Sequence, residues 1–136
     1  MMNMNRKTLL GLGLGAASSL LARPGEIAVA AVGDEKKITE GVTQKILGEE
    51  MSMIPGYKSV RLRDIILQPG SEIKAFPMPN AMVCHIAEGE LQVNQDGKQF
   101  SAKKGYVWTC KIGTSEGTAN TGSTVAIMRV ADLLTS

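Results

Sequence analysis

Several sulfur-containing side chains lie in the second half of this 136-residue sequence, and they offer its most specific chemistry. Met78, Met82 and Cys84 are close together, and Cys110 follows in a later apolar run. Thioether and thiolate sulfur atoms are soft donors that suit Cu(I) better than harder divalent ions. One hypothesis is therefore a Cu(I) site formed by Met78, Met82 and Cys84, with Cys110 as a further donor.

The two cysteines, Cys84 and Cys110, allow a second interpretation. In an oxidising compartment, a pair of cysteines most often forms a disulfide. This bridge would close a loop of about 26 residues and stabilise the fold by about 3–4 kcal/mol on the chain-entropy account. Because a disulfide removes both thiolates as metal ligands, the bridge and the Cu(I) site exclude one another in a single molecule.

The single histidine and one glutamate are further candidates. His85 follows Cys84 directly, and neighbouring residues of a strand point to opposite faces, which argues against a cysteine–histidine nucleophile. Glu116 lies in a stretch rich in Gly, Thr and Ser over 114–122, which predicts a loop and a solvated carboxylate. Burial against apolar side chains would instead raise the pKa of Glu116 and make it a candidate acid or base.

Short apolar runs separated by turn signals must position these residues. The runs cover 42–47, 60–67, 82–93, 106–112 and 124–130. Alternation in the second run slips in phase near Asp64, which a β-bulge would explain. Asp96-Gly97 is a strong hairpin signal. About seven short strands with almost no helical periodicity predict an antiparallel sandwich or barrel.

Two stretches of the chain resemble the two motifs of the cupin superfamily. The first motif, G-x5-H-x-H-x3-4-E-x6-G, aligns without a gap from Gly70 to Gly89. The second, G-x5-P-x-G-x2-H-x3-N, aligns without a gap from Gly105 to Asn120. The resemblance covers about residues 42–131 and implies a single antiparallel jelly-roll barrel. It also implies a homodimer, because cupins commonly pair edge to edge.

The ligand positions of the cupin motifs carry other residues here. Metal-dependent cupins hold iron, manganese, nickel or zinc with two His, one Glu and a third His. The corresponding residues are, in order, Phe76, Met78, Met82 and Glu116. Phenylalanine has no donor atom, and methionine binds hard or borderline dications poorly. The resemblance instead implies an apolar, sulfur-rich pocket in the barrel with Glu116 at its rim, formed by Phe76, Met78, Met82, Cys84, Trp108, Cys110 and Glu116.

Residues 1–30 differ in character from the rest and predict a secretory signal peptide. Two basic residues precede an uncharged run over 8–22, and small residues at 28–30 offer a cleavage site, with Ala22 as an alternative. The run is shorter than the roughly 20 apolar residues that span a bilayer. We therefore expect export to the periplasm or the outside, with no membrane span after removal of the signal. A polar lead over 31–41 and a tail over 132–136 flank the expected barrel.

The charge of the remaining chain argues against a nucleic-acid partner. The first thirty residues hold three of the 15 basic and one of the 13 acidic residues, so the remainder has 12 of each and is formally neutral. The sequence thus predicts an exported, non-catalytic small cupin-barrel protein that binds a small apolar ligand or a soft metal such as Cu(I). The expected cofactor is copper if the soft-metal site forms, and the protein is expected to have no cofactor if it binds an apolar ligand. The alternative is a metal-dependent, oxygenase- or isomerase-like enzyme with an atypical centre.

Overall fold

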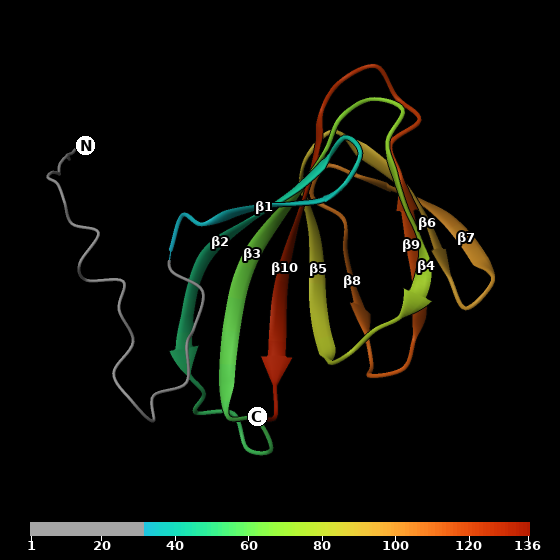
Figure 1. Cartoon of the computed structure of the whole chain (residues 1–136). Coiled ribbons are helices and arrows are strands. Elements are labelled where there is room, and N and C mark those ends of the chain that lie inside the picture. Colours follow the sequence, from blue (N-terminus) through green and yellow to red (C-terminus); the bar gives the residue numbers. More distant parts are fainter. Residues whose placement is uncertain (1–31) are drawn as a thin grey trace, which may run out of the picture. The chain divides into compact units, whose positions relative to one another are not determined.

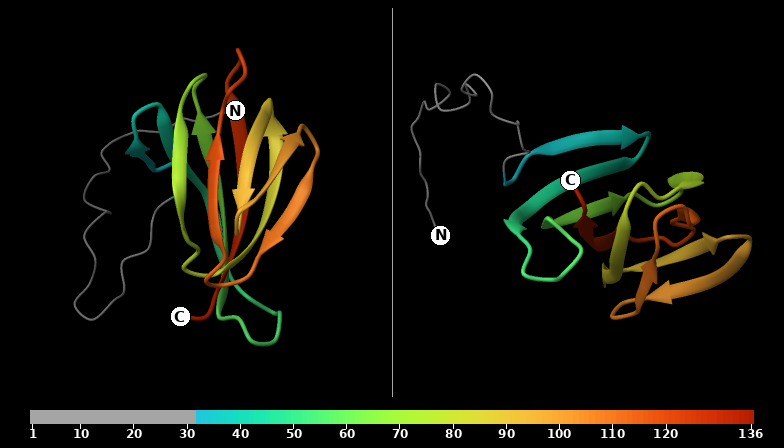
Figure 2. Two further views of the ribbon diagram at one scale, coloured as in Figure 1. Left: turned by 90° about the vertical axis from the view of Figure 1, so that its right-hand side faces the viewer. Right: turned by 90° about the horizontal axis from the view of Figure 1, so that it is seen from below.

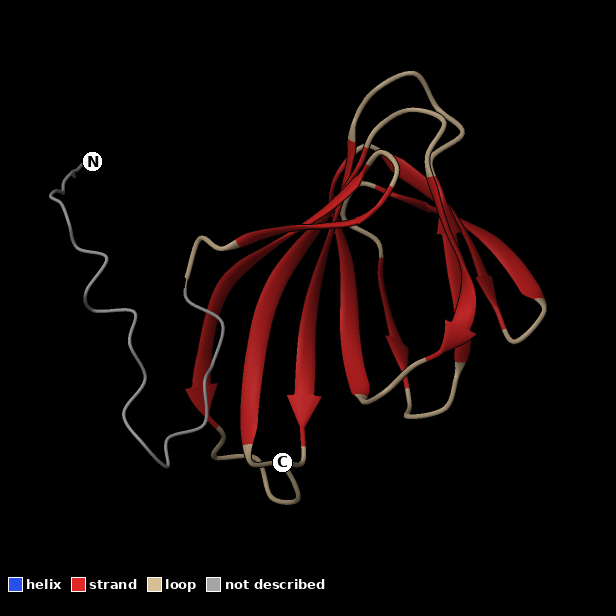
Figure 3. Cartoon of the chain, viewed as in Figure 1, coloured by secondary structure: helices blue, strands red, loops and turns tan. Residues whose placement is uncertain are grey.

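Every regular element in residues 32–136, the part of the chain that the computed structural model describes, is a β-strand (Figures 1 and 3). The ten strands are β1 (Glu35–Thr39), β2 (Val42–Met51), β3 (Ser59–Leu67), β4 (Glu72–Pro77), β5 (Ala81–Glu88), β6 (Glu90–Gln95), β7 (Lys98–Lys103), β8 (Val107–Cys110), β9 (Ser115–Ala119) and β10 (Ala126–Leu134). The predicted all-β class is confirmed.

The signal peptide predicted over residues 1–30 lies outside the described residues. Within the described range, 32–136, no helix is long and apolar enough to cross a membrane.

The strands form two antiparallel sheets, which are the two layers of the domain in Figures 1 and 2. One sheet has six strands in the order β1-β2-β3-β10-β5-β8, and the other has four in the order β4-β9-β6-β7. β10 therefore lies in the middle of the larger sheet, paired with β3 on one side and β5 on the other. Buried side chains from both sheets form one hydrophobic cluster, so the expected jelly-roll arrangement is confirmed.

Alternation along β5 determines which side chains enter the core. Met82, Cys84 and Ile86 are buried, whereas Val83 and His85 lie on the other face and are more accessible. The sequence-based expectation that His85 points away from the face of Cys84 is confirmed. A direct cysteine–histidine pair is therefore absent from this strand.

The irregularity predicted near Asp64 lies in a different strand. β3 pairs with β10 without interruption, whereas the register of β2 against β3 shifts between Ile46 and Gly48. The predicted bulge in β3 is wrong because the extra residue belongs to its neighbour β2. Since alternation in β3 is unbroken, the face that carries Ile65 into the core also carries Arg63.

β9 replaces part of the loop predicted over 114–122. This prediction is wrong for residues 115–119, because β9 pairs with β4 on one side and with β6 on the other. Pairing on both sides outweighs the weak strand preference of Ser and Gly. Gly117 is required by this packing, since a Cβ there would lie 2.7 Å from the backbone nitrogen of Ala75 on β4.

Strands also extend into the flanking segments. β1 lies within the polar lead over 31–41, and β10 continues into the tail over 132–136. All residues of β1 are exposed, and it pairs with β2 at the edge of the sheet. Exposed charged side chains on an edge strand discourage its pairing with the edge of another chain.

Candidate functional site

A cavity of about 130 Å³ lies between the two sheets. This volume is close to that of an engineered protein cavity, of about 150 Å³, that binds benzene. Most of the lining is apolar, with one cationic side chain, one carboxylate and one hydroxyl. The lining residues are Ile38, Arg63, Ile65, Ile73, Phe76, Met78, Met82, Glu116, Gly117, Thr118, Met128 and Val130.

The seven residues predicted to form the pocket fall into two groups. Phe76, Met78, Met82 and Glu116 line the cavity, whereas Cys84, Trp108 and Cys110 are buried outside that lining. Phe76 is 47% exposed and lies on the accessible side of the cavity wall. Glu116 is only 4% exposed, so the expectation of a rim position or a solvated loop is wrong. Its burial follows from its place in β9, which pairs on both sides.

Glu116 belongs to a buried cluster with the two cysteines. Each of the three residues offers one donor atom, and these atoms of Cys84, Cys110 and Glu116 all lie within 4.8 Å of one another. Cys110 Sγ and Trp108 Nε1 each donate to Glu116 Oε1 at 3.0 Å, and Gln95 Nε2 donates to the same oxygen at 3.4 Å. These donors replace the water that the carboxylate loses on burial. Gln95 was not predicted from the sequence, because a glutamine at the end of a strand carries no distinctive signal.

The environment of Cys84 makes it a poor nucleophile. Hydrogen bonding with Cys110, burial and the negative charge of Glu116 all raise the pKa of the Cys84 thiol, and Arg63 only partly opposes them. The thiolate is the reactive form of cysteine, so this environment disfavours nucleophilic reaction at Cys84.

Both cysteines are free in the structure, where the sequence allowed a disulfide. In the register of β5 and β8, Cys84 faces Trp108 and Met82 faces Cys110, so the two cysteines are diagonal neighbours. Diagonal residues have Cα atoms about 7–8 Å apart, whereas disulfides need roughly 4.4–6.8 Å. Forming the bridge would therefore require β8 to shift against β5.

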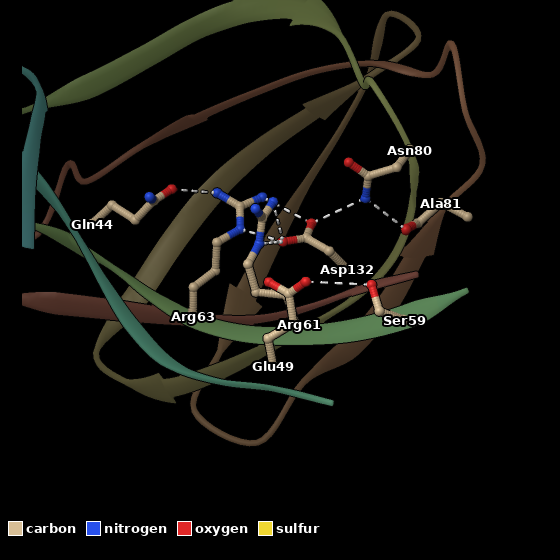
Figure 4. Close-up of polar contacts among 8 residues, drawn as sticks. All are labelled: Gln44, Glu49, Ser59, Arg61, Arg63, Asn80, Ala81 and Asp132. Atoms are coloured by element: carbon tan, nitrogen blue, oxygen red, sulfur yellow. Dashed lines mark hydrogen bonds and ion pairs between the residues drawn. The ribbon is translucent and has the colours of Figure 1, made fainter. Parts of the chain in front are cut away.

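Arg63 is held at the cavity wall by a buried carboxylate (Figure 4). Its Nε and Nη2 atoms donate to Asp132 at 2.6 and 3.0 Å, and its Nη1 donates to Gln44 at 2.9 Å. Arg61 Nε and Asn80 Nδ2 also donate to Asp132, both at 3.1 Å. Two arginines thus share one carboxylate, and the guanidinium of Arg63 has a fixed orientation.

The charge state of Asp132 follows from these contacts. Its side chain is fully buried, and burial acts to raise its pKa. The hydrogen bonds and positive charge of Arg63, with smaller contributions from Asn80 and Arg61, outweigh burial and hold the pKa of Asp132 below its ordinary value. Asp132 is therefore a stable anion and a positioning residue for Arg63.

Thr118 contributes an unpaired hydroxyl to the cavity lining. In the part of the chain that the structure describes, Thr118 Oγ1 is the buried side-chain oxygen or nitrogen that has no hydrogen-bond partner. A buried polar group of this kind costs about 1–3 kcal/mol. Neither Thr118 nor Arg63 was predicted from the sequence, although unbroken alternation over 60–67 would have placed Arg63 on the inner face.

Replacing Thr118 by valine is expected to stabilise the protein by about 1 kcal/mol, because it removes the unpaired hydroxyl at nearly constant volume. Urea unfolding of the two proteins measures the difference. Thr118→Ser, which keeps the hydroxyl and loses a methyl group, is the control and should destabilise by about 1 kcal/mol. A valine variant less stable than the wild type would show that a bound molecule already satisfies the hydroxyl.

The chain resembles known proteins in structure but not detectably in sequence. No protein family profile matches the chain, and no curated protein is similar to it in sequence. KdgF from Halomonas sp. superposes with a TM-score of 0.61 at 10% identity, covering 77% of this chain and 94% of that one. An RmlC-like cupin from Shewanella frigidimarina superposes with a TM-score of 0.58 at 18% identity, covering 74% of this chain and 84% of that one. This chain has the cupin fold. At these identities, the likeness extends to the fold and no further.

The solved structures that are similar to this chain also include an enzyme. Salicylate 1,2-dioxygenase from Pseudoaminobacter salicylatoxidans superposes with a TM-score of 0.57 at 16% identity, over 71% of this chain and 28% of that one. The His/Glu metal centre typical of cupin enzymes does not fit the present residues. Phe76 has no donor atom, and Met78 and Met82 offer only thioethers.

Proposed function

We propose that this chain is a non-catalytic binding protein whose barrel holds a small, mostly apolar molecule with an anionic group. The observation that carries the proposal is a cavity with an apolar lining and a single oriented guanidinium, that of Arg63. Phe76, Met78 and Met82 contribute apolar surface where metal-dependent cupins have ligands. Concave apolar sites with a few fixed polar groups are typical of small-molecule binding.

Arg63 supports an anionic group on the ligand. A guanidinium has five N–H groups, and three of those on Arg63 are used by Asp132 and Gln44. One N–H group on each Nη atom remains without a partner among these contacts, and carboxylates are common acceptors for such groups. Because Asp132 is shared with Arg61, one carboxylate pairs with two cations, and the three side chains together carry one net positive charge.

The opposite wall supports an oriented ligand. Thr118 and Glu116 belong to β9 in the four-stranded sheet, whereas Arg63 belongs to β3 in the six-stranded sheet. The cavity is thus positive on one wall and negative on the other. A ligand carboxylate is expected against Arg63, with the far end of the ligand toward Thr118.

Benzoate is a suitable probe, with benzyl alcohol and benzylamine as its neutral and cationic counterparts. We expect benzoate to bind at least about tenfold more tightly than either counterpart, since a charge-assisted hydrogen bond contributes about 1.5–3 kcal/mol. NMR titration of the folded protein measures the three affinities. Binding of no probe, or equal binding of all three, would contradict the proposal.

Two arginine variants separate ligand binding from the structural role of the cluster. Arg63→Met should remove the preference for benzoate, whereas Arg61→Met should keep it. Both arginines contact Asp132, but Arg61 does not line the cavity. Loss of the preference in both variants would assign the effect to the Asp132 cluster rather than to contact with Arg63.

The alternative function is an oxygenase- or isomerase-like enzyme with an atypical metal centre. It would require donors other than Phe76, Met78 and Met82. Export, a homodimer and the absence of a nucleic-acid partner also belong to this proposal and rest on the sequence. Cell fractionation and light scattering of the purified protein test the first two.

A further inference from the structure

We propose that Cys84, Cys110 and Glu116 form a second site, which binds one thiophilic divalent metal ion of the Zn²⁺ class. This site differs from the Cu(I) site predicted from the sequence, because the carboxylate of Glu116 takes the place of the thioethers of Met78 and Met82, while the two cysteines are common to both. It also goes beyond the proposed organic ligand, which is bound by Arg63 and the apolar cavity lining.

The positions of the three donor atoms support a single ion. They lie within 4.8 Å of one another, and Cys110 Sγ and Glu116 Oε1 are 3.0 Å apart. Zinc binds sulfur at about 2.3 Å and carboxylate oxygen at about 2.0–2.2 Å, so two ligands of one ion are separated by less than about 4.6 Å. Small rotations of buried side chains are enough to bring all three within bonding distance.

The site is supported by rigid elements on both sheets. Cys84 lies on β5, Cys110 on β8 and Glu116 on β9, and all three side chains are buried. Trp108 donates to Glu116 Oε1, and Gln95 Nε2 is 3.4 Å from both that oxygen and Cys110 Sγ. Hydrogen bonds of this kind hold metal ligands in position in known sites.

Charge favours a divalent ion over Cu(I). Metal binding releases one proton from each thiol to solvent, so two thiolates and one carboxylate carry a total charge of −3. A divalent ion leaves −1 in the buried site, whereas Cu(I) leaves −2. Buried net charge is costly, and the divalent complex minimises it.

The position of the two cysteines also favours a metal over a disulfide. Their diagonal placement on β5 and β8 is too wide for an unstrained S–S bond, whereas an ion adds about 4.6 Å of reach between two sulfur atoms. Glu116 also lines the cavity, so one ligand of the proposed site borders that space.

Cadmium titration tests the proposal directly. Protein prepared under reducing conditions and freed of metal by chelator is titrated with Cd²⁺, whose thiolate complexes absorb in the ultraviolet. We expect one equivalent of Cd²⁺ to bind and produce this absorption band, and the same band to appear when Cd²⁺ displaces one equivalent of bound Zn²⁺, because thiolates bind the softer ion more tightly. X-ray absorption of the wild-type zinc complex should show two sulfur ligands, a result that depends on no variant.

Variants separate this site from the site predicted from the sequence. Cys84→Ser and Cys110→Ser should each lower the affinity for Zn²⁺ by about 100-fold or more, and Glu116→Gln by about tenfold. Met78→Leu and Met82→Leu should leave it within about threefold. Circular dichroism of each variant confirms that it is folded.

Three results would overturn the proposal. They are the absence of a stoichiometric cadmium band in the folded wild type, a methionine variant as impaired as a cysteine variant, and tight Cu(I) binding without zinc binding. The last would restore the Cu(I) site at Met78, Met82 and Cys84. Benzoate binding is measured separately and depends on Arg63, so failure of either proposal leaves the other distinguishable.

Discussion

Replacing Asp132 by asparagine is expected to lower the free energy of unfolding by about 3–5 kcal/mol, the usual loss when one partner of a buried ion pair is removed. The side chain of Asp132 has 0% exposure, and that of Arg63 has 17%. Asparagine keeps the shape but removes the negative charge, so Arg63 and Arg61 become two neighbouring cations without a counter-ion. Urea unfolding at neutral pH measures the loss.

Asp64→Asn is the matched control for this substitution. Asp64 makes a similar bidentate contact with Arg129, at 2.8 and 3.0 Å, but the Arg129 side chain is 43% exposed. Water compensates a cation at such a site, so we expect a loss of about 1 kcal/mol or less. Equal losses in the two variants would mean that burial does not set the strength of the Asp132 cluster.

The same cluster predicts how stability changes in acid. Because the pKa of folded Asp132 is below its ordinary value of about 3.8, its contribution to stability is fully present above that ordinary value. The contribution is lost as the pH falls through the lowered pKa of the folded state. The difference in unfolding free energy between the wild type and Asp132→Asn should therefore shrink below about pH 4.

Replacing Gly89 by alanine is expected to destabilise the protein by about 2–5 kcal/mol. Gly89 has a φ of +74°, and a Cβ there would lie 2.7 Å from the carbonyl oxygen of Val125 and 2.9 Å from Cα of Ala126. The left-handed conformation costs about 1–3 kcal/mol for a non-glycine residue, and displacing packed backbone costs a similar amount. Thermal and urea unfolding measure the total.

Gly97→Ala separates these two contributions. Gly97 has a φ of +83°, close to that of Gly89, but a Cβ there meets no atom within 4 Å. It should show the conformational cost alone, about 1–2 kcal/mol. If both variants lose the same stability, close packing against the start of β10 adds nothing at Gly89.

Local sequence signals predicted most of the strands correctly, and long-range contacts account for the errors. Alternation and the Asp96-Gly97 turn are properties of neighbouring residues, and the structure has strands on both sides of that turn. β9 has no such signal of its own and depends on pairing with β4 and β6. Its misassignment also led to the wrong environment for Glu116.

The site required information that no local pattern contains. Arg63 and Asp132 are 69 positions apart, and nothing near either residue indicates its partner. The resemblance to cupin motifs correctly predicted that Met82 and Glu116 line one cavity. It did not predict the diagonal offset between Cys84 and Cys110, because that offset depends on the register of β5 and β8. The unpaired hydroxyl of Thr118 depends on all its neighbours at once.

The central place of β10 in the six-stranded sheet has a consequence for synthesis of the protein. Of the ten strands, β10 leaves the ribosome last, yet it joins β3 to β5 along most of its length. Until it emerges, β1, β2 and β3 have no hydrogen-bonded connection to β5 and β8, and Arg63 lacks its carboxylate. The native barrel therefore forms only after translation of this domain is complete, and the apolar faces of the earlier strands lack their native partners until then.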